Sequence, residues 1–281
     1  MSSAAITAAV AGAGLLHASW NAVAHRLDDK AISFALMGVV DVLFGLVVAF
    51  ALPLPACGAW PYLLASVVVH TGYTMLLIRA YQLGDFTQMY PIARGVSPLI
   101  VGVVAVTVVG QHLDAVQLAG LAVVCAGLAC VAFGGGRVNL SDRPALLAAV
   151  ATGGSIATYT VLDGVGVRHA HGSLGYTGWL FLLFGPVFPI AVIAGRGLRR
   201  TVEVAQPVLV PGLVSGVVGL AAYGIVIWAQ TRSNLAAVSA TRERSILFGA
   251  LIGTVLFKER FGAWRIAGAG LTVVGILAIN L

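Results

Sequence analysis

The sequence predicts an all-α membrane protein with ten transmembrane helices, built as two five-helix repeats that enter the membrane in opposite senses. Three observations lead to this prediction: the apolar composition, the spacing of the apolar segments and an internal match between the two halves. Of the 281 residues, 59% are hydrophobic and only 9% are charged, and the mean hydropathy is +0.99. Soluble domains are roughly half apolar and about one quarter charged. Lipid is therefore the expected surrounding medium.

Ten apolar segments appear when the chain is divided at its proline, glycine and charge clusters. A helix needs about 20 apolar residues to cross roughly 30 Å of hydrocarbon, so ten such helices use nearly the whole chain. We expect helices rather than strands, because a backbone in lipid must satisfy its own hydrogen bonds. The expected segments are 3–24, 31–52, 60–83, 86–109 and 113–134, followed by 144–166, 173–195, 207–230, 234–257 and 262–280.

The two halves of the chain match each other at an offset of 148 residues. We therefore divide the chain into a first repeat, 1–136, and a second repeat, 143–281. Because each repeat holds an odd number of spans, the second must cross the membrane in the opposite sense. Inverted repeats of this kind point to secondary transport, with a site at the repeat interface. The matched pairs are Gln82 with Gln230, Arg94 with Arg242, Ser97 with Ser245, Gly120 with Gly268, and Gly127 with Gly275.

Two short motifs, together with the five-plus-five arrangement, resemble those of the EamA-type drug/metabolite transporters. Trp20-Asn21 lies late in the first span, and Phe257-Lys258-Glu259-Arg260-Phe261 precedes a glycine-rich last segment. The resemblance covers essentially the whole chain and implies transport of amino acids and related metabolites, commonly by export. One departure is that the acidic residue expected before the last helix of each half is Glu259 in the second repeat but Gln111 in the first.

Basic residues are unevenly divided between the two sets of short loops. Positive residues favour the cytoplasmic side, so the loops rich in basic residues should face the cytoplasm. With ten spans, this orientation would place both termini outside. The expected location is the inner or plasma membrane, which the chain would cross several times. The family resemblance instead favours both termini inside. One set of loops holds Arg26, Lys30, Arg137, Arg143, Arg196, Arg199, Arg200, Lys258 and Arg260, and the other holds Arg168 and Arg232.

The candidate substrate-binding residues are polar or aromatic side chains placed at membrane depth. Ionisable groups there cost several kcal/mol unless they pair or line water, so each is a functional candidate. The repeat generates two groups, one near each membrane face. The first group is His17, Trp20, Asn21, Arg79, Tyr90 and Arg94, and the second is Tyr159, Tyr223, Trp228, Arg242 and Glu243, accompanied by Asp163 and Arg244.

Two spans carry the most informative charges. In the fourth span, Pro91 and Pro98 flank Arg94 and should kink the helix. Arg94 then either faces a cavity or pairs with a structural carboxylate such as Asp41 or Asp85. In the ninth span, Arg242 is expected to line a cavity, and Glu243 is either part of a pairing network that closes a gate or a proton carrier. A carboxylate in a low dielectric can exchange a proton near neutral pH.

The balance of charges suggests the substrate class. Four arginines, Arg79, Arg94, Arg242 and Arg244, stand against Asp41 and Glu243, and arginine binds carboxylate and phosphate in a bidentate manner. We predict a secondary transporter that exports a small anionic or zwitterionic, amino-acid-like metabolite by alternating access, driven by a proton or by the substrate's own gradient. The alternatives are a multidrug exporter of lipophilic cations, a transporter of phosphonate-related solutes, and a membrane-embedded enzyme acting on a lipid-linked substrate. The phosphonate alternative comes from a resemblance to a phosphonate-associated branch of the family, carried by the segment Leu16-His17-Ala18-Ser19-Trp20-Asn21.

Several motifs are missing from the sequence. It contains no GxxxxGK[ST] phosphate loop, no HExxH and no GxSxG, so neither ATP hydrolysis nor intramembrane hydrolysis is predicted. We expect no enzyme activity, no cofactor and no metal ion. The scattered positive charges argue against nucleic-acid binding. The expected partners are the lipid bilayer, a small-molecule substrate and a coupling proton, and a monomer is compatible with these features.

Overall fold

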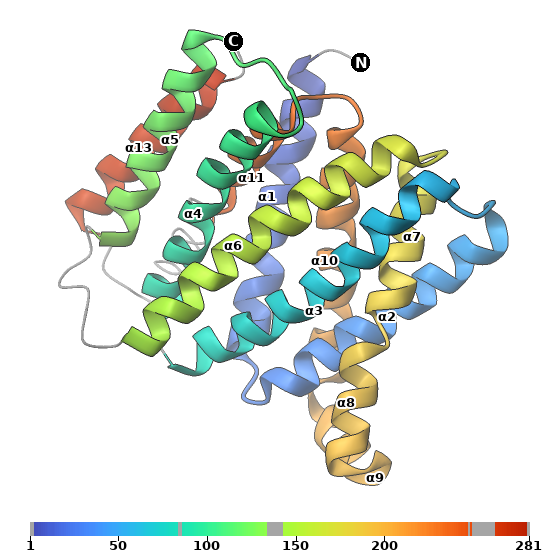
Figure 1. The fold of residues 1–281 in the computed structure, drawn as a ribbon. Coiled ribbons are helices and arrows are strands. Elements are labelled where there is room, and N and C mark those ends of the chain that lie inside the picture. Colours follow the sequence, from blue (N-terminus) through green and yellow to red (C-terminus); the bar gives the residue numbers. More distant parts are fainter. Residues whose placement is uncertain (1–2, 84–85, 134–142, 247, 249–261, 280–281) are drawn as a thin grey trace.

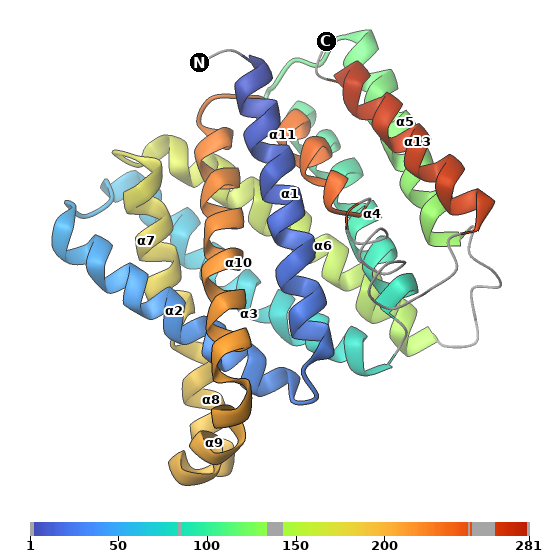
Figure 2. The same cartoon turned by 180° about the vertical axis from the view of Figure 1, so that it is seen from behind.

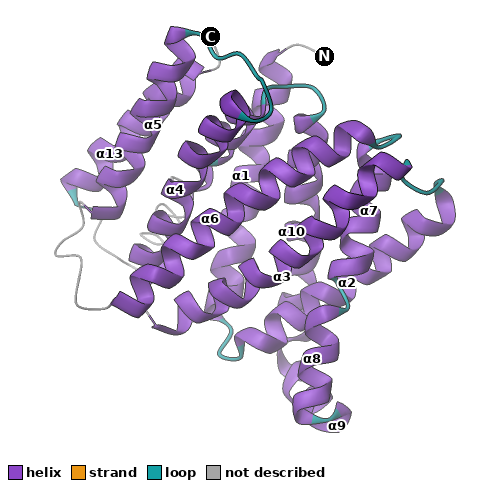
Figure 3. Ribbon diagram, in the orientation of Figure 1, coloured by secondary structure: helices purple, strands orange, loops and turns teal. Residues whose placement is uncertain are grey.

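The computed structural model describes residues 3–83, 86–133, 143–246, 248 and 262–279. Within these ranges the regular elements are all helical, which confirms the all-α prediction (Figure 3). The first half forms α1 (Ser3–Arg26), α2 (Lys30–Ala51), α3 (Trp60–Leu83), α4 (Phe86–Thr107) and α5 (Ala115–Phe133). The second forms α6 (Arg143–Gly166), α7 (Ser173–Phe184), α8 (Val187–Arg196), α9 (Leu198–Ala205), α10 (Leu209–Gln230), α11 (Leu235–Arg242) and α13 (Ala263–Ile279).

Five helical stretches of the described chain are long and apolar enough to cross a membrane. They are Lys30–Ala51, Cys57–Arg79, Leu146–His169, Ser173–Arg196 and Leu198–Gln230, and shorter apolar helices cover Ser97–Thr107, Ala115–Val131 and Ile266–Ile279. The membrane location is thus supported by length and composition. The count of ten crossings stays a prediction.

Large apolar side chains cover much of the outer surface. On α2, Val47 is 66% exposed and Phe50 is 89% exposed, and α10 similarly exposes Val210 and Val214. Apolar patches of this extent are rare on soluble monomers, where water would penalise them. In lipid they meet hydrocarbon, so the same surface is expected to be well solvated.

The last helix of each half lies at one edge of the molecule. Helices α5 and α13 lie side by side there in both Figure 1 and Figure 2. Their backbones approach closely at glycine: a Cβ atom on Gly127 would lie 2.6 Å from the Thr272 nitrogen, and one on Gly120 would lie 2.9 Å from the Gly275 oxygen. Small residues at such contacts let helices pack by van der Waals attraction, which drives helix association in lipid.

The segment expected as one span over 173–195 is divided into α7 and α8. The division falls at Gly185-Pro186. Pro186 has no backbone N–H, so it cannot donate to the carbonyl four residues earlier, and its ring disturbs a continuous helix. At this break α2 approaches closely, because a Cβ atom on Gly38 would collide with the Gly185 oxygen.

The loop between α1 and α2 is tied to the end of α8. Asp29 caps α2 by accepting a hydrogen bond from the Ile32 N–H at 3.1 Å, and Arg196 forms an ion pair with the same carboxylate. The short helix α9, which carries Arg199 and Arg200, lies at the end of the molecule opposite both termini (Figure 1). Predicted basic loops therefore lie together at one end, although Arg137, Lys258 and Arg260 lie outside the described residues.

The close contact of α5 with α13 predicts a large cost for a single methyl group. We expect Gly127→Ala to lower the stability of the purified protein by about 1–3 kcal/mol, because the new Cβ would collide with backbone atoms. The matched control is Gly154→Ala in α6, where nothing lies within 4 Å of the new Cβ. This control should be neutral or slightly stabilising. Thermal unfolding in detergent measures both, and equal melting temperatures for the two variants would contradict the contact.

Candidate functional site

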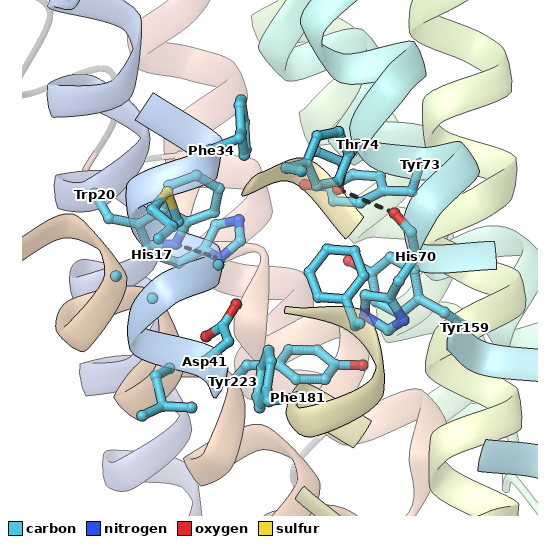
Figure 4. A pocket seen from close by; sticks show the side chains of 17 residues that line it. His17, Trp20, Phe34, Asp41, His70, Tyr73, Thr74, Tyr159, Phe181 and Tyr223 are labelled. Carbon is cyan, nitrogen blue, oxygen red and sulfur yellow. Dashed lines mark hydrogen bonds between the residues drawn. The ribbon is translucent and has the colours of Figure 1, made fainter. Parts of the chain in front are cut away.

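A small chamber lies between helices from both halves of the chain, with a volume of about 80 Å³ (Figure 4). Its wall combines a carboxylate, two imidazoles and many aromatic rings. The lining side chains come from α1 (His17, Trp20), α2 (Phe34, Met37, Asp41), α3 (His70, Tyr73, Thr74), α6 (Tyr159), α7 (Phe181, Phe184), α8 (Phe188) and α10 (Leu220, Tyr223), with Gly38, Gly216 and Gly219 completing the wall.

Aromatic rings make up most of this wall and pack against one another. Phe34 lies 6.3 Å from Trp20 and 6.1 Å from Phe188, measured between ring centroids, and Phe184 lies 6.0 Å from Phe188. Edge-to-face and tilted pairs at these distances are favourable beyond their burial. We call this surface the aromatic wall, defined as Trp20, Phe34, Tyr73, Tyr159, Phe181, Phe184, Phe188 and Tyr223.

Each of the two histidines of the chamber has polar contacts within the protein. The His70 ring stacks on Tyr159 with centroids 4.0 Å apart, and its Nδ1 lies 3.1 Å from the Ser66 hydroxyl. His17 Nδ1 lies 3.3 Å from the indole N–H donor of Trp20, and its Nε2 lies 3.3 Å from Arg94 Nη1. A neutral imidazole has only one acceptor nitrogen, so His17 can accept from one of these two donors at a time.

Behind the chamber, Arg94 connects three helices. Its Nε lies 2.9 Å from Glu243 Oε2, and its Nη2 donates to the Ser245 hydroxyl at 3.0 Å and to the Arg242 carbonyl at 3.5 Å. The Arg94 and Glu243 side chains are 2% and 1% exposed. The sequence allowed Asp41 or Asp85 as the partner of Arg94. The structure instead pairs it with Glu243, because α4 packs against α11, and Asp85 lies outside the described residues.

A second polar group surrounds Arg242. Its Nη2 donates to the Tyr159 hydroxyl at 3.0 Å, and its guanidinium carbon lies 5.8 Å from the ring centroids of both Tyr159 and Tyr223. The Tyr223 hydroxyl in turn donates to Asp163 Oδ2 at 2.5 Å, and the Tyr176 hydroxyl donates to Asp163 Oδ1 at 2.9 Å. The Asp163 carboxylate is therefore satisfied by hydrogen bonds inside the protein rather than offered to a solute.

The structure brings most of the predicted site residues together. The sequence placed them in two groups near opposite membrane faces, but the hydrogen bond from Arg94 to the Arg242 carbonyl joins the groups into one cluster. His17, Trp20, Tyr159 and Tyr223 line the chamber, whereas Arg94, Arg242 and Glu243 do not. The Asn21 side chain donates to the His17 carbonyl at 2.8 Å within α1 and likewise does not line the chamber.

Two predicted residues lie away from both the chamber and the cluster around Arg94, and a third cannot be placed. Arg79 is exposed near the end of α3. Trp228 packs in a separate apolar cluster near the end of α10, beneath Arg232, whose guanidinium carbon lies 4.9 Å from the indole centroid. Tyr90 lies in α4, but its side chain is outside the described part of the structure.

Sequence reasoning missed several residues of the chamber, of which Asp41 is the most informative. The sequence pattern does contain a signal for it. Gly38, Asp41 and Gly45 are spaced at i, i+3 and i+7, so they share one helix face, and that face packs by glycine contact against α7. A carboxylate on a closely packed face must point into the protein. Phe34, Phe181, Phe184 and Phe188 carried no comparable signal, because phenylalanine is equally common on lipid-facing surfaces.

The predicted excess of arginine is not found among the buried charges that the structure describes. Among the described residues with fully buried charged side chains, two are arginines, Arg94 and Arg242, and three are acids, Asp41, Asp163 and Glu243. The sequence-based count differed because it included Arg79, which is exposed, and Arg244, which is only half-buried, and left out Asp163. The arginines thus give no direct support for an anionic solute in the chamber.

A chamber shared by the two halves of a helical membrane protein is the kind of place where membrane transporters bind a solute. The profile of the EamA-like transporter family matches residues 143–281. The second half of the chain thus matches a family whose members are transporters of small solutes, and over these residues the resemblance drawn from the sequence is confirmed.

Two further comparisons describe the relationship to known proteins. A crystal structure of another protein superposes with a TM-score of 0.72 over 98% of this chain and 95% of its own, at 16% sequence identity. At that identity the likeness extends to the fold alone. Among curated proteins, none matches the chain in sequence. Within the described ranges, no group of three or more His, Cys, Asp or Glu side chains could hold a metal ion.

The buried pair of Arg94 and Glu243 predicts strong coupling between the two side chains. We expect Arg94→Met and Glu243→Met each to lower stability by about 3–5 kcal/mol, because each leaves an uncompensated buried charge. The double variant should recover much of this loss, since it removes both charges. Thermal unfolding in detergent of the wild type, the two single variants and the double variant gives the coupling energy of a double-mutant cycle. The exposed pair of Arg199 and Glu203 is the matched control, for which we expect no measurable coupling. Additive losses at Arg94 and Glu243 would contradict the pairing.

Proposed function

We propose that this chain is a secondary transporter that exports a small, amino-acid-like zwitterionic solute by alternating access. The observation that carries the proposal is the chamber, whose wall is contributed by α1, α2 and α3 of the first half and by α6, α7, α8 and α10 of the second. A site shared between two halves can open to one side or the other as the halves tilt.

We further propose that the halves form an inverted repeat with ten crossings. One hydrogen bond and two glycine contacts support this. Arg94 and Arg242, which the offset matches, meet directly through the hydrogen bond from Arg94 Nη2 to the Arg242 carbonyl at 3.5 Å. Gly120 approaches Gly275 while Gly127 approaches Gly268. A two-fold axis between the repeats would exchange Gly120 with Gly268 and Gly127 with Gly275. It would therefore turn the contact of Gly120 with Gly275 into the contact of Gly268 with Gly127, and both contacts are present. We also propose that the basic end faces the cytoplasm of the inner or plasma membrane.

In this scheme the pair of Arg94 and Glu243 acts as a gate. It joins α4 to the residue that follows α11, so the two halves cannot separate there without breaking it. A broken pair needs water around both charges. Opening on that side therefore requires hydration, and closing expels the water. The alternative role as proton carrier is less well supported, because Glu243 is already engaged by Arg94 and does not line the chamber.

The chamber also bears on the alternative functions. A transporter of lipophilic cations is the second candidate, and the aromatic wall together with Asp41 favours it. Purely anionic solutes and phosphonates would need arginine on the lining, and the described lining contains none. A membrane-embedded enzyme would convert its substrate without moving it across the membrane, so transport assays separate that class.

The proposal predicts vectorial movement of a zwitterion. Purified protein in proteoliposomes should take up labelled leucine or phenylalanine, and an imposed pH gradient should change the accumulated level if a proton is coupled. Protein-free liposomes are the control. Product formation without accumulation would favour an enzyme, and uptake of a quaternary amine with no amino-acid uptake would favour the cation exporter.

The gate role of Glu243 predicts a particular kinetic defect. Because Gln has no charge to hold Arg94, Glu243→Gln should alter the uptake rate by roughly tenfold or more, corresponding to the loss of about 1.4 kcal/mol or more from the closed state. Any dependence of uptake on the pH gradient should remain. Glu203→Gln, on the exposed helix α9, is the control. Loss of that dependence with exchange retained would instead identify Glu243 as the proton carrier.

A further inference from the structure

Asp41 differs from the other buried acids of the protein. Its carboxylate points toward the open centre of the chamber (Figure 4), and the residue is 6% exposed. Asp163 accepts hydrogen bonds from two tyrosine hydroxyls, and Glu243 pairs with Arg94. In the part of the chain that the structure describes, no hydrogen bond or ion pair reaches the Asp41 carboxylate. A buried carboxylate without a partner is costly, so this position favours a ligand that supplies the missing partner.

The position of Asp41 is held by the packing of α2 against the α7–α8 break. A Cβ atom on Gly185 would lie 2.9 Å from the Asp41 Cβ, and Gly45 approaches the Gly178 carbonyl further along the same face. The helices are therefore in backbone contact on both sides of Asp41. Its side chain has no route to the lipid or to either surface along this face. The carboxylate is pre-organised toward the chamber, which reduces the cost of binding.

The chemistry around the carboxylate favours a cation with an apolar body. The aromatic wall presents ring faces that attract positive charge. No lysine or arginine is among the described residues of the lining. The fully buried charges of the described chain are three acids and two arginines, so one further positive charge would balance them. A metal ion is a poor match, because hard cations need about six or more oxygen ligands, and Asp41 is the one carboxylate among the described lining residues.

We propose that the chamber binds an ammonium group, with Asp41 as its direct ligand and the aromatic wall holding an apolar or aromatic body. The inference rests on the proposed transport function, because it names the class of solute that is carried. It also identifies which end of a zwitterion the site recognises. The amine is held by the first half through Asp41 on α2, while Tyr159, Phe181 and Tyr223 of the second half contact the body of the solute.

The test compares two probes of similar shape and opposite charge, 2-phenylethylammonium and 3-phenylpropionate. Binding to the purified wild-type protein in detergent is measured by titration calorimetry. We expect the ammonium probe to bind at least about tenfold more tightly than the carboxylate probe, since a charge-assisted bond in a buried site exceeds about 1.4 kcal/mol. This comparison needs no variant. Equal or tighter binding of 3-phenylpropionate would overturn the inference.

Variants of the lining residues then test which side chains bind the ammonium group. Asp41→Asn should weaken binding of 2-phenylethylammonium at least about tenfold, whereas Glu203→Gln should leave it unchanged. Phe34→Leu keeps the apolar volume but removes a ring, and it should weaken binding about two- to fivefold. Asp41→Asn should melt at or above the wild-type temperature, because it removes an unpaired buried charge. Unchanged ammonium binding by a folded Asp41→Asn protein would overturn the role of Asp41.

The two proposals fail in different ways. Ammonium binding that depends on Asp41, without uptake of any amine or amino acid into proteoliposomes, would support the site and overturn transport. Uptake that Asp41→Asn leaves intact, together with unchanged binding, would support transport and overturn the site. The calorimetric and vesicle measurements are therefore interpreted separately.

Discussion

The placement of the Arg94 guanidinium determines how the two halves of this protein meet. A charge at membrane depth must be paired or hydrated, and Arg94 meets this condition through groups on two other segments, His17 on α1 and the stretch from Arg242 to Ser245 that closes α11. These segments must come together for the charge to be tolerated. Their meeting places α1 and α4 of the first half against α11 of the second. The chamber lies beside this junction, and helices of both halves form its wall.

The sequence predicted the all-helical architecture because hydropathy and length are strong signals in a membrane protein. It also identified Arg94, Arg242 and Glu243, because charged residues in long apolar segments are rare and costly. It did not predict which acid pairs with Arg94. That choice depends on the rotation of each helix about its axis, which an apolar pattern specifies poorly when the outer face meets lipid and the inner face meets other apolar side chains. In a soluble helix, the polar face would have set the rotation.

The same limit explains why the chamber was only partly predicted. Trp20, Tyr159 and Tyr223 carry polar atoms that argued for an interior position, whereas Phe34 and Phe188 could equally have faced lipid. The sequence named Asp41 only as one possible partner of Arg94 and not as a residue of the site, because its surroundings depend on the glycine contact between α2 and α7. The break at Gly185-Pro186 contributes to those surroundings, and a hydropathy profile that continues through proline does not reveal it.

An unpaired carboxylate in the chamber gives a solute a way to influence the whole protein. A ligand shifts a conformational equilibrium only by as much as it binds one state better than another. The chamber in this conformation is small, about 80 Å³, and its wall belongs to both halves. A solute whose ammonium group is held by Asp41 on α2 would have its apolar body against Tyr159 and Tyr223 of the second half. The solute can therefore contact both halves at once only when the two halves lie close together. Binding of the solute would then favour the arrangement in which the halves close around it. After release, a closed chamber would leave the Asp41 carboxylate buried without a partner, and this cost would favour reopening. Asp41, the buried acid without a partner among the described residues, is thus the group best placed to couple ligand binding to movement.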